Sequence, residues 1–116
     1  MTFRSYGHKP WGHYLNIFDA SYTKVKQIVI KPGESPSYQY HYKRSEVWVI
    51  VQGTAEVRLD ESTDVYGVGD VIQIPTLAKH QPKNIGDEDL IFVEIQLGEY
   101  FGEDDIVRLE DKYGRV

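Results

Sequence analysis

The stretch Gly33-x5-Gln39-x-His41-x4-Glu46-x6-Gly53 contains the residues that decide the fold. Side chains alternate between the two faces of a strand, so Gln39 and His41, two residues apart, point to the same side. Glu46 follows a short polar turn at residues 42–45 and begins an apolar run, which we expect to be the next strand of a hairpin. The three side chains can therefore reach one metal ion held on β-strands.

A second stretch, Gly69-x5-Pro75-x4-His80-x3-Asn84, supplies a fourth candidate ligand from a separate strand. Two imidazoles, a carboxylate and an amide oxygen suit one divalent ion; zinc is preferred, and manganese, cobalt, nickel and iron also tolerate the set. A lone histidine is more often a hydrogen-bonded core residue, but His41 and His80 fall at paired positions. Gln39 can instead orient a ligand or a bound water, and Glu46 can be a surface residue of the turn.

Short apolar segments separated by Gly, Pro and Asp clusters predict an all-β sandwich or barrel. The expected strands are residues 11–18, 24–30, 37–41, 46–52, 54–59, 71–74, 80–84 and 90–97. No long segment with a 3.6-residue period competes with this pattern. Residues 101–113 fit either a short helix or an irregular wrap.

The two stretches resemble the paired motifs of the cupin superfamily, which usually has His at the position of Gln39 and Gly at the position of Leu77. Gln-x-His in place of His-x-His is similar to the phosphomannose isomerases. The flanking residues that strengthen the likeness are Lys9-Pro10-Trp11-Gly12, Arg44-x-Glu46-x-Trp48, Ile74-Pro75, Glu94-x-Gln96, Gly102-Glu103-Asp104-Asp105-Ile106-Val107-Arg108 and Asp111-x-Tyr113-Gly114-Arg115. This pattern resembles the type II mannose-6-phosphate isomerase module over residues 9–115.

In other proteins that module follows a mannose-1-phosphate guanylyltransferase domain. The resemblance implies a cupin-type double-stranded jelly-roll β-barrel. It also implies the interconversion of mannose 6-phosphate and fructose 6-phosphate through a cis-enediol. Arg44, expected in the turn before Glu46, can bind the phosphate or stabilise the enediolate. Glu94 is the candidate base if its strand turns it into the barrel, where burial raises a carboxyl pKa.

Further cations are needed for an anionic substrate, because the chain carries a net charge of −5. Lys26 and Arg108 are the candidates that can meet a phosphate beside Arg44, although each can equally be a solvated surface residue. Asp105 can hold Arg108 in place. The acidic balance argues against nucleic-acid binding through a basic surface.

The length and composition of the chain limit what we expect of its domains, partners and location. A chain of 116 residues suits a single domain, residues 1–116, with no room for a nucleotidyltransferase; a separate guanylyltransferase chain is therefore a candidate partner. No cysteine is present, and no apolar run approaches the length of a membrane span, so we expect a cytoplasmic protein that does not bind membranes. Exposed sheet edges in so small a barrel favour a homodimer.

Two other classes of function stay open at this point. One is a different metal-dependent cupin enzyme, such as an isomerase or epimerase of another sugar, or an iron dioxygenase. Gln39 argues against the dioxygenase, because three-His iron sites would have His there. The other is a noncatalytic module that binds a sugar phosphate and docks onto a guanylyltransferase. Two segments, Pro36-x-Tyr38 and Tyr42-Lys43, differ from the residues that the family usually has there. These differences put the identity of the substrate in question more than the binding of a metal.

Overall fold

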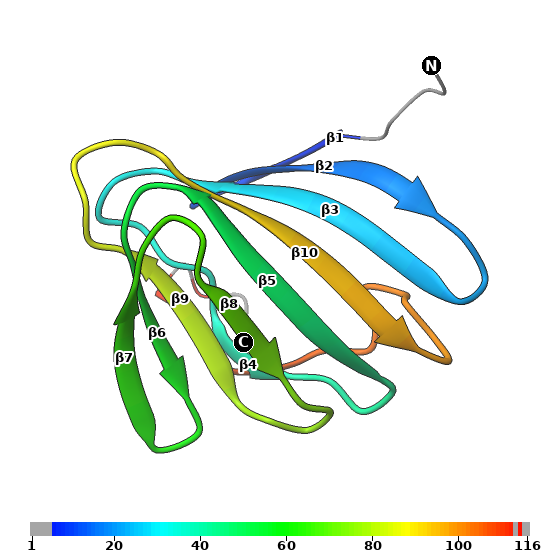
Figure 1. Ribbon diagram of the computed structural model, residues 1–116. Helices are drawn as coiled ribbons and strands as arrows, with labels where there is room; N and C mark the ends of the chain where they lie inside the picture. The colour runs from blue at the N-terminus through cyan, green and yellow to red at the C-terminus, as the bar shows by residue number, and fades with distance from the viewer. Residues whose placement is uncertain (1–5, 113, 115–116) are drawn as a thin grey trace.

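The computed structural model describes residues 6–112 and 114, and these residues form strands and connecting loops. The strands are β1 (Tyr6–Lys9), β2 (Gly12–Asp19), β3 (Thr23–Ile30), β4 (Tyr38–Tyr40), β5 (Arg44–Gln52), β6 (Ala55–Leu59), β7 (Ser62–Tyr66), β8 (Val71–Ile74), β9 (His80–Asn84), β10 (Leu90–Gly98) and β11 (Val107–Glu110). They pair into two sheets that face each other (Figure 1). One has the order β1-β2-β3-β10-β5-β8 and the other β11-β4-β9-β6-β7. The predicted all-β jelly roll is confirmed.

The inner face of the six-stranded sheet changes from apolar to polar at one level across three adjacent strands. On β10, Leu90 and Phe92 are followed on the same face by Glu94 and Gln96, and all four side chains are buried. On the antiparallel neighbour β5, the order along the chain is reversed: Arg44 and Glu46 come first and Trp48 and Ile50 follow. The barrel interior therefore has an apolar half and a polar half.

The apolar half is the hydrophobic core, to which both sheets contribute. Trp48 packs on Phe92 with ring centroids 4.7 Å apart, and Val57 and Ala55 meet them from the five-stranded sheet. Lys26 on β3 shares the inward face of Ile28 and Ile30 but lies at the polar level, opposite Glu94 in the register. Apolar packing at one end thus holds charged side chains at the other.

The expected hairpin around residues 42–45 is wrong. β4 pairs with β9 and β11, whereas β5 pairs with β10 and β8, so residues 41–43 cross from one sheet to the other. Arg44 is the first residue of β5 and not a turn residue, and its side chain is buried. The candidate ligands still converge, because the inner faces of the two sheets point at each other.

Three strands were not anticipated: β1, β7 and β11. β11 replaces the helix that was one option for the tail, and residues 99–106 before it form the irregular wrap that was the other option. Tyr113 and Arg115 of the tail motif lie outside the described residues. Among the residues that are described, none forms a helix of the length and apolarity needed to cross a membrane.

Candidate metal centre

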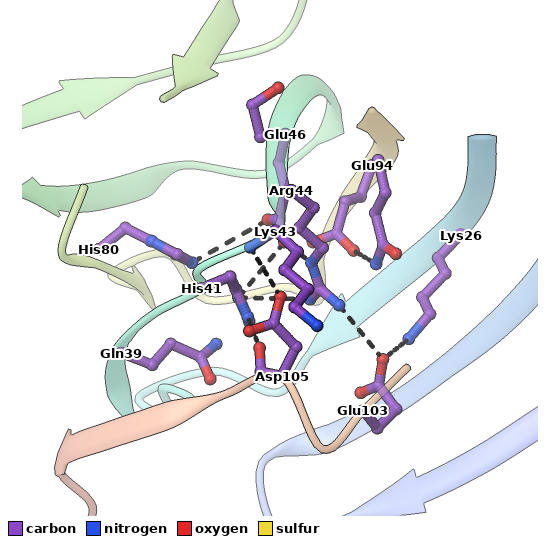
Figure 2. Close-up of polar contacts among 12 residues, drawn as sticks. Lys26, Gln39, His41, Lys43, Arg44, Glu46, His80, Glu94, Glu103 and Asp105 are labelled. Carbon is purple, nitrogen blue, oxygen red and sulfur yellow. Dashed lines mark hydrogen bonds and ion pairs between the residues drawn. The ribbon is translucent and has the colours of Figure 1, made fainter. Parts of the chain in front are cut away.

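Three buried side chains meet at the polar end of the barrel, where the two sheets face each other (Figure 2). His41 follows the end of β4, His80 begins β9, and Glu46 comes from β5 of the opposite sheet. One candidate ligand atom from each residue lies within 4.8 Å of the other two. His41 Nε2 is 3.5 Å from Glu46 Oε2, and His80 Nε2 is 4.0 Å from Glu46 Oε1.

Backbone carbonyls fix the tautomer of both imidazoles. His41 Nδ1 lies 2.6 Å from the carbonyl oxygen of Asp105, and His80 Nδ1 lies 2.9 Å from that of Ala78. A carbonyl can only accept, so each Nδ1 carries a proton and donates, which leaves Nε2 as the ring atom that faces Glu46 and can bind an ion when the ring is neutral. Burial also lowers the pKa of His41, which favours the neutral ring that ligation requires.

Glu46 is held by two donors and stays ionised. Arg44 Nε donates to Oε2 at 2.9 Å, and Trp48 Nε1 donates to Oε1 at 2.9 Å. Burial by itself would raise the pKa of Glu46, but His80 and Arg44 outweigh it and lower that pKa to about 2. A carboxylate is therefore available to a cation across the neutral pH range.

These residues fit a divalent ion. His80 Nε2 is buried and makes no hydrogen bond to any residue that the structure describes. This nitrogen is therefore available to an ion, together with the second imidazole and the carboxylate. His41 Nε2 accepts from Arg44 Nη2 at 3.3 Å. An imidazole nitrogen has one lone pair, so an ion bound at His41 would replace this contact.

Gln39 lies next to the triad on the five-stranded sheet. It pairs in register with His80 on β9 and with Arg108 on β11, so the three side chains occupy one row of one face. Ser37 Oγ donates to Gln39 Oε1 at 3.3 Å. The row places the amide beside the imidazoles, and its role as a ligand stays a prediction.

A pocket opens beside this centre. Its polar lining residues are Lys9, Lys26, Ser37, Gln39, Arg44, Glu94, Glu103 and Arg108. Its aromatic wall is formed by Trp11, Tyr14, Trp48 and Phe92. Arg44 belongs to both sites, because its guanidinium contacts Glu46 and His41 and also lines the pocket.

Glu94 faces into the pocket and is buried, as its strand pattern allowed. Burial, and after it the negative charge of Glu46, raise its pKa to about 8 against the opposing effects of Lys26 and Arg44. Gln96 Nε2 donates to Glu94 Oε2 at 2.8 Å, which fixes the carboxyl group in place. A carboxyl group with a pKa in this range can exchange a proton near neutral pH.

The three predicted cations border the same pocket from two sheets. Lys26 comes from β3 and Arg44 from β5, whereas Arg108 comes from β11 of the facing sheet. The Nε of Arg108 and the Nη1 of Arg44 are buried and make no hydrogen bond within the described part of the chain. Each keeps a donor for a ligand.

The sequence did not predict the contacts that Asp105 and Glu103 make near the site. Asp105 does not hold Arg108 as suggested; its carboxylate accepts from the amides of Tyr42 and Lys43 at 3.0 and 2.9 Å, and its carbonyl holds His41. Glu103, for which the sequence predicted no contact, pairs with Lys26 at 3.0 Å. The dense likeness of residues 102–108 to the family motif was the available signal, but it did not say which groups they contact.

A family model described as mannose-6-phosphate isomerase C-terminal matches residues 1–111. The chain belongs to this family. Relatives include the mannose-1-phosphate guanylyltransferase ManC of Salmonella typhimurium, 43% identical over 109 residues, and the xanthan biosynthesis protein XanB of Xanthomonas campestris, 44% identical over 109 residues. Each match covers 94% of this chain and 23% of the relative. The chain thus spans about a quarter of the length of these relatives.

Solved structures share the fold. The oxalate decarboxylase of Lactobacillus farciminis is 28% identical with a TM-score of 0.79, over 91% of this chain and 33% of that chain. The cupin domain of Cnp3 from Schizosaccharomyces pombe is 17% identical with a TM-score of 0.72, over 74% of this chain and 64% of that domain. The jelly roll is therefore a cupin fold.

Proposed function

We propose that this chain is a metal-dependent aldose-ketose isomerase that interconverts mannose 6-phosphate and fructose 6-phosphate. The observation that carries the proposal is a buried His41, Glu46 and His80 cluster beside a pocket lined by Glu94 and four cationic residues, among them Lys26, Arg44 and Arg108. Family membership supports the substrate class.

His41, Glu46 and His80 would hold the ion, with Gln39 as a fourth ligand. When bound, a divalent ion supplies Lewis-acid stabilisation of negative charge on a substrate oxygen. Zinc is the first candidate, and manganese, cobalt, nickel and iron suit the same donors.

The remaining chemistry belongs to groups of the chain itself. Isomerisation moves one proton between C2 and C1 of the sugar and a second between O2 and O1. Glu94 would take the carbon-bound proton and return it to the other carbon. Arg44 would stabilise the negative charge that develops on the enediol oxygens, because its guanidinium contacts His41 and Glu46 and also lines the pocket. Lys26, Arg44 and Arg108 would hold the phosphate.

Proton NMR of mannose 6-phosphate in deuterated water tests the proposal. Chelated protein reconstituted in turn with zinc, cobalt and manganese should yield fructose 6-phosphate with deuterium at C1. Mannose 6-phosphate re-formed by the reverse reaction should carry deuterium at C2, and chelation should stop both. The His80→Ala variant should be inactive, whereas His13→Ala should keep activity, because His13 stacks on Tyr6 away from the site. Turnover that survives complete chelation would refute the metal-dependent mechanism.

A noncatalytic module that binds a sugar phosphate is the second candidate, because the chain corresponds to only 23% of relatives named for guanylyltransferase activity. Binding of mannose 6-phosphate without turnover, with every metal, would favour it. In either case we propose that the protein acts in the cytoplasm in GDP-mannose and polysaccharide synthesis, in which a separate guanylyltransferase chain is the candidate partner.

A further inference from the structure

One carboxylate oxygen of Glu103 lies between two cations of the pocket. Oε2 is 3.0 Å from Lys26 Nζ and 3.6 Å from Arg44 Nη1 (Figure 2). The side chains of the two cations are 5% and 6% exposed, whereas that of Glu103 is 51% exposed. The carboxylate therefore reaches buried positive charges from the solvent side of the pocket.

The two cations need an anion at this point. A buried ammonium or guanidinium is costly unless it is paired. Arg44 also pairs with Glu46, while Lys26 packs over the Tyr14 ring, 4.4 Å from its centroid. Although partial burial would raise the pKa of Glu103, Lys26 and Arg44 lower it, so its carboxylate is charged at neutral pH. Glu103 supplies the counter-charge for both.

Glu103 can leave this position without unfolding its segment. Two residues later, Asp105 fastens the segment to residues 41–43 through both carboxylate oxygens and its carbonyl. The present pocket holds about 80 Å³, room for a handful of water molecules at the ~10–15 Å³ that each one needs. Glu103 is part of the wall of this pocket, so its movement would enlarge the space.

We propose that Glu103 is a specificity-determining residue that occupies the anion position between Lys26 and Arg44 and gives it up only to a dianionic phosphate group. This inference rests on the proposed function, because it assigns the substrate phosphate to that position. A phosphate group carries about −1.5 to −2 charges and three acceptor oxygens, so it compensates both cations when the carboxylate leaves. A neutral sugar brings no such charge, and its binding leaves the Glu103 pairs intact or the cations unpaired.

Calorimetric titration of inorganic phosphate into the full chain, with chelator present so that phosphate cannot bind a metal, tests this. The variants are Glu103→Gln, Glu103→Ala and the matched control Asp104→Asn, which removes the same charge one residue further along. Removal of the competing carboxylate should tighten phosphate binding about fivefold, the scale of one partly exposed ion pair. Asp104→Asn should match the wild-type protein, and Lys26→Met should lose the binding.

Phosphate affinity that is unchanged or weaker in both Glu103 variants would overturn the inference, since the carboxylate would then orient the cations and not compete for them. The absence of phosphate binding in every variant would overturn it as well. Neither result depends on turnover. A chain that binds phosphate more tightly after Glu103→Gln, yet never isomerises a sugar, would keep this inference and refute the proposed function.

Discussion

Two neighbouring carboxyl groups on the inner face of the six-stranded sheet have opposite proton affinities. Glu46 is surrounded by His80, Arg44 and His41 and has a pKa lowered to about 2, whereas burial raises the pKa of Glu94 to about 8. A pair of carboxyl groups separated in this way suits two roles, one as a permanent anion for a cation and one as a proton carrier.

The raised pKa of Glu94 predicts a specific pH dependence of stability. In metal-free folded protein Glu94 keeps its proton up to about pH 8, while in the unfolded chain it loses the proton near its ordinary pKa of 4.5. Its contribution to stability is thus full below pH 4.5 and is lost as pH rises to 8, by roughly 1.4 kcal/mol per pKa unit. Glu94→Gln should lack this loss.

Denaturant unfolding of wild-type and Glu94→Gln protein from pH 5 to 9, with chelator present, measures the effect. The difference in the free energy of unfolding between variant and wild type should move in favour of the variant as pH rises. A difference that stays constant with pH would contradict the raised pKa.

The candidate ligands could be anticipated from spacing, but their supports could not. Gln39 and His41 are two residues apart and His80 occupies the second motif, so local pattern placed them on strands. Asp105 lies 64 residues from His41, and no local pattern reports a contact over that distance. The inward turn of Glu94 and Lys26 was undecided in the sequence, because only the packed sheet shows that their face is the barrel interior.

At the level of elements, the irregular segment 99–106 and the crossing 41–43 hold each other in place. The Asp105 carboxylate accepts from the Tyr42 and Lys43 amides, and Glu99 N donates to the Lys43 carbonyl at 3.3 Å. The crossing carries His41 into the barrel. The position of one candidate ligand therefore depends on a segment that follows β10.

This dependence predicts that Asp105→Ala weakens metal binding without removing a ligand. The amides of the crossing would lose their acceptors, so His41 would be less well oriented. We expect zinc affinity to fall by about 10- to 100-fold, the usual effect of removing a group that orients a ligand. Asp104→Ala is the matched control and should bind zinc as the wild type does. Equal zinc affinities for Asp105→Ala and wild type would show that the contacts of the Asp105 carboxylate with the crossing are not needed to orient His41.

The close approach of Gly98 to β5 predicts a second effect. Its φ of 150° lies in the range that favours glycine, and a Cβ atom there would lie 2.3 Å from the Lys43 carbonyl oxygen and 2.9 Å from the Arg44 Cα. Gly98→Ala should destabilise the fold by about 1–3 kcal/mol, the typical cost of overpacking. Gly67→Ala, where no atom lies within 4 Å of the new Cβ, should leave the denaturation midpoint close to wild type. Similar midpoints for both variants would exclude a tight contact at Gly98.

The elements themselves were predicted unevenly, for physical reasons. The central strands β3, β5 and β10 carry long apolar patterns because they are paired on both sides. β7 has no such pattern, since it is an edge strand whose Ser62, Thr63, Asp64 and Val65 are exposed. The hairpin error has a related cause: a short polar connection looks the same whether it joins strands of one sheet or crosses between two.

At the scale of the whole molecule, the two ends of the barrel separate the hydrophobic core from the candidate site. Apolar side chains fill one end of the barrel, and the other end holds Lys26, His41, Arg44, Glu46 and Glu94 in burial. Buried charges are costly, and their concentration at one level of one cavity is the pattern expected of a functional site and not of a structural core.

The expected homodimer stays a prediction, for which an edge of the six-stranded sheet is the candidate surface. β1 pairs with β2 on one side, and the exposed Tyr6, Phe18 and Tyr22 belong to or adjoin this N-terminal part of the sheet. Such an edge favours pairing with a second chain. Size-exclusion chromatography with light scattering should give twice the 13.4 kDa chain mass. A monomer at all protein concentrations would refute the dimer.

Calorimetric titration of zinc into chelator-treated protein tests the central claim, a metal centre at His41, Glu46 and His80, most directly. We predict one zinc ion per wild-type chain, loss of that binding in His80→Ala, and unchanged binding in the control His13→Ala. No saturable binding by the wild type, or equal binding by His80→Ala, would contradict the account.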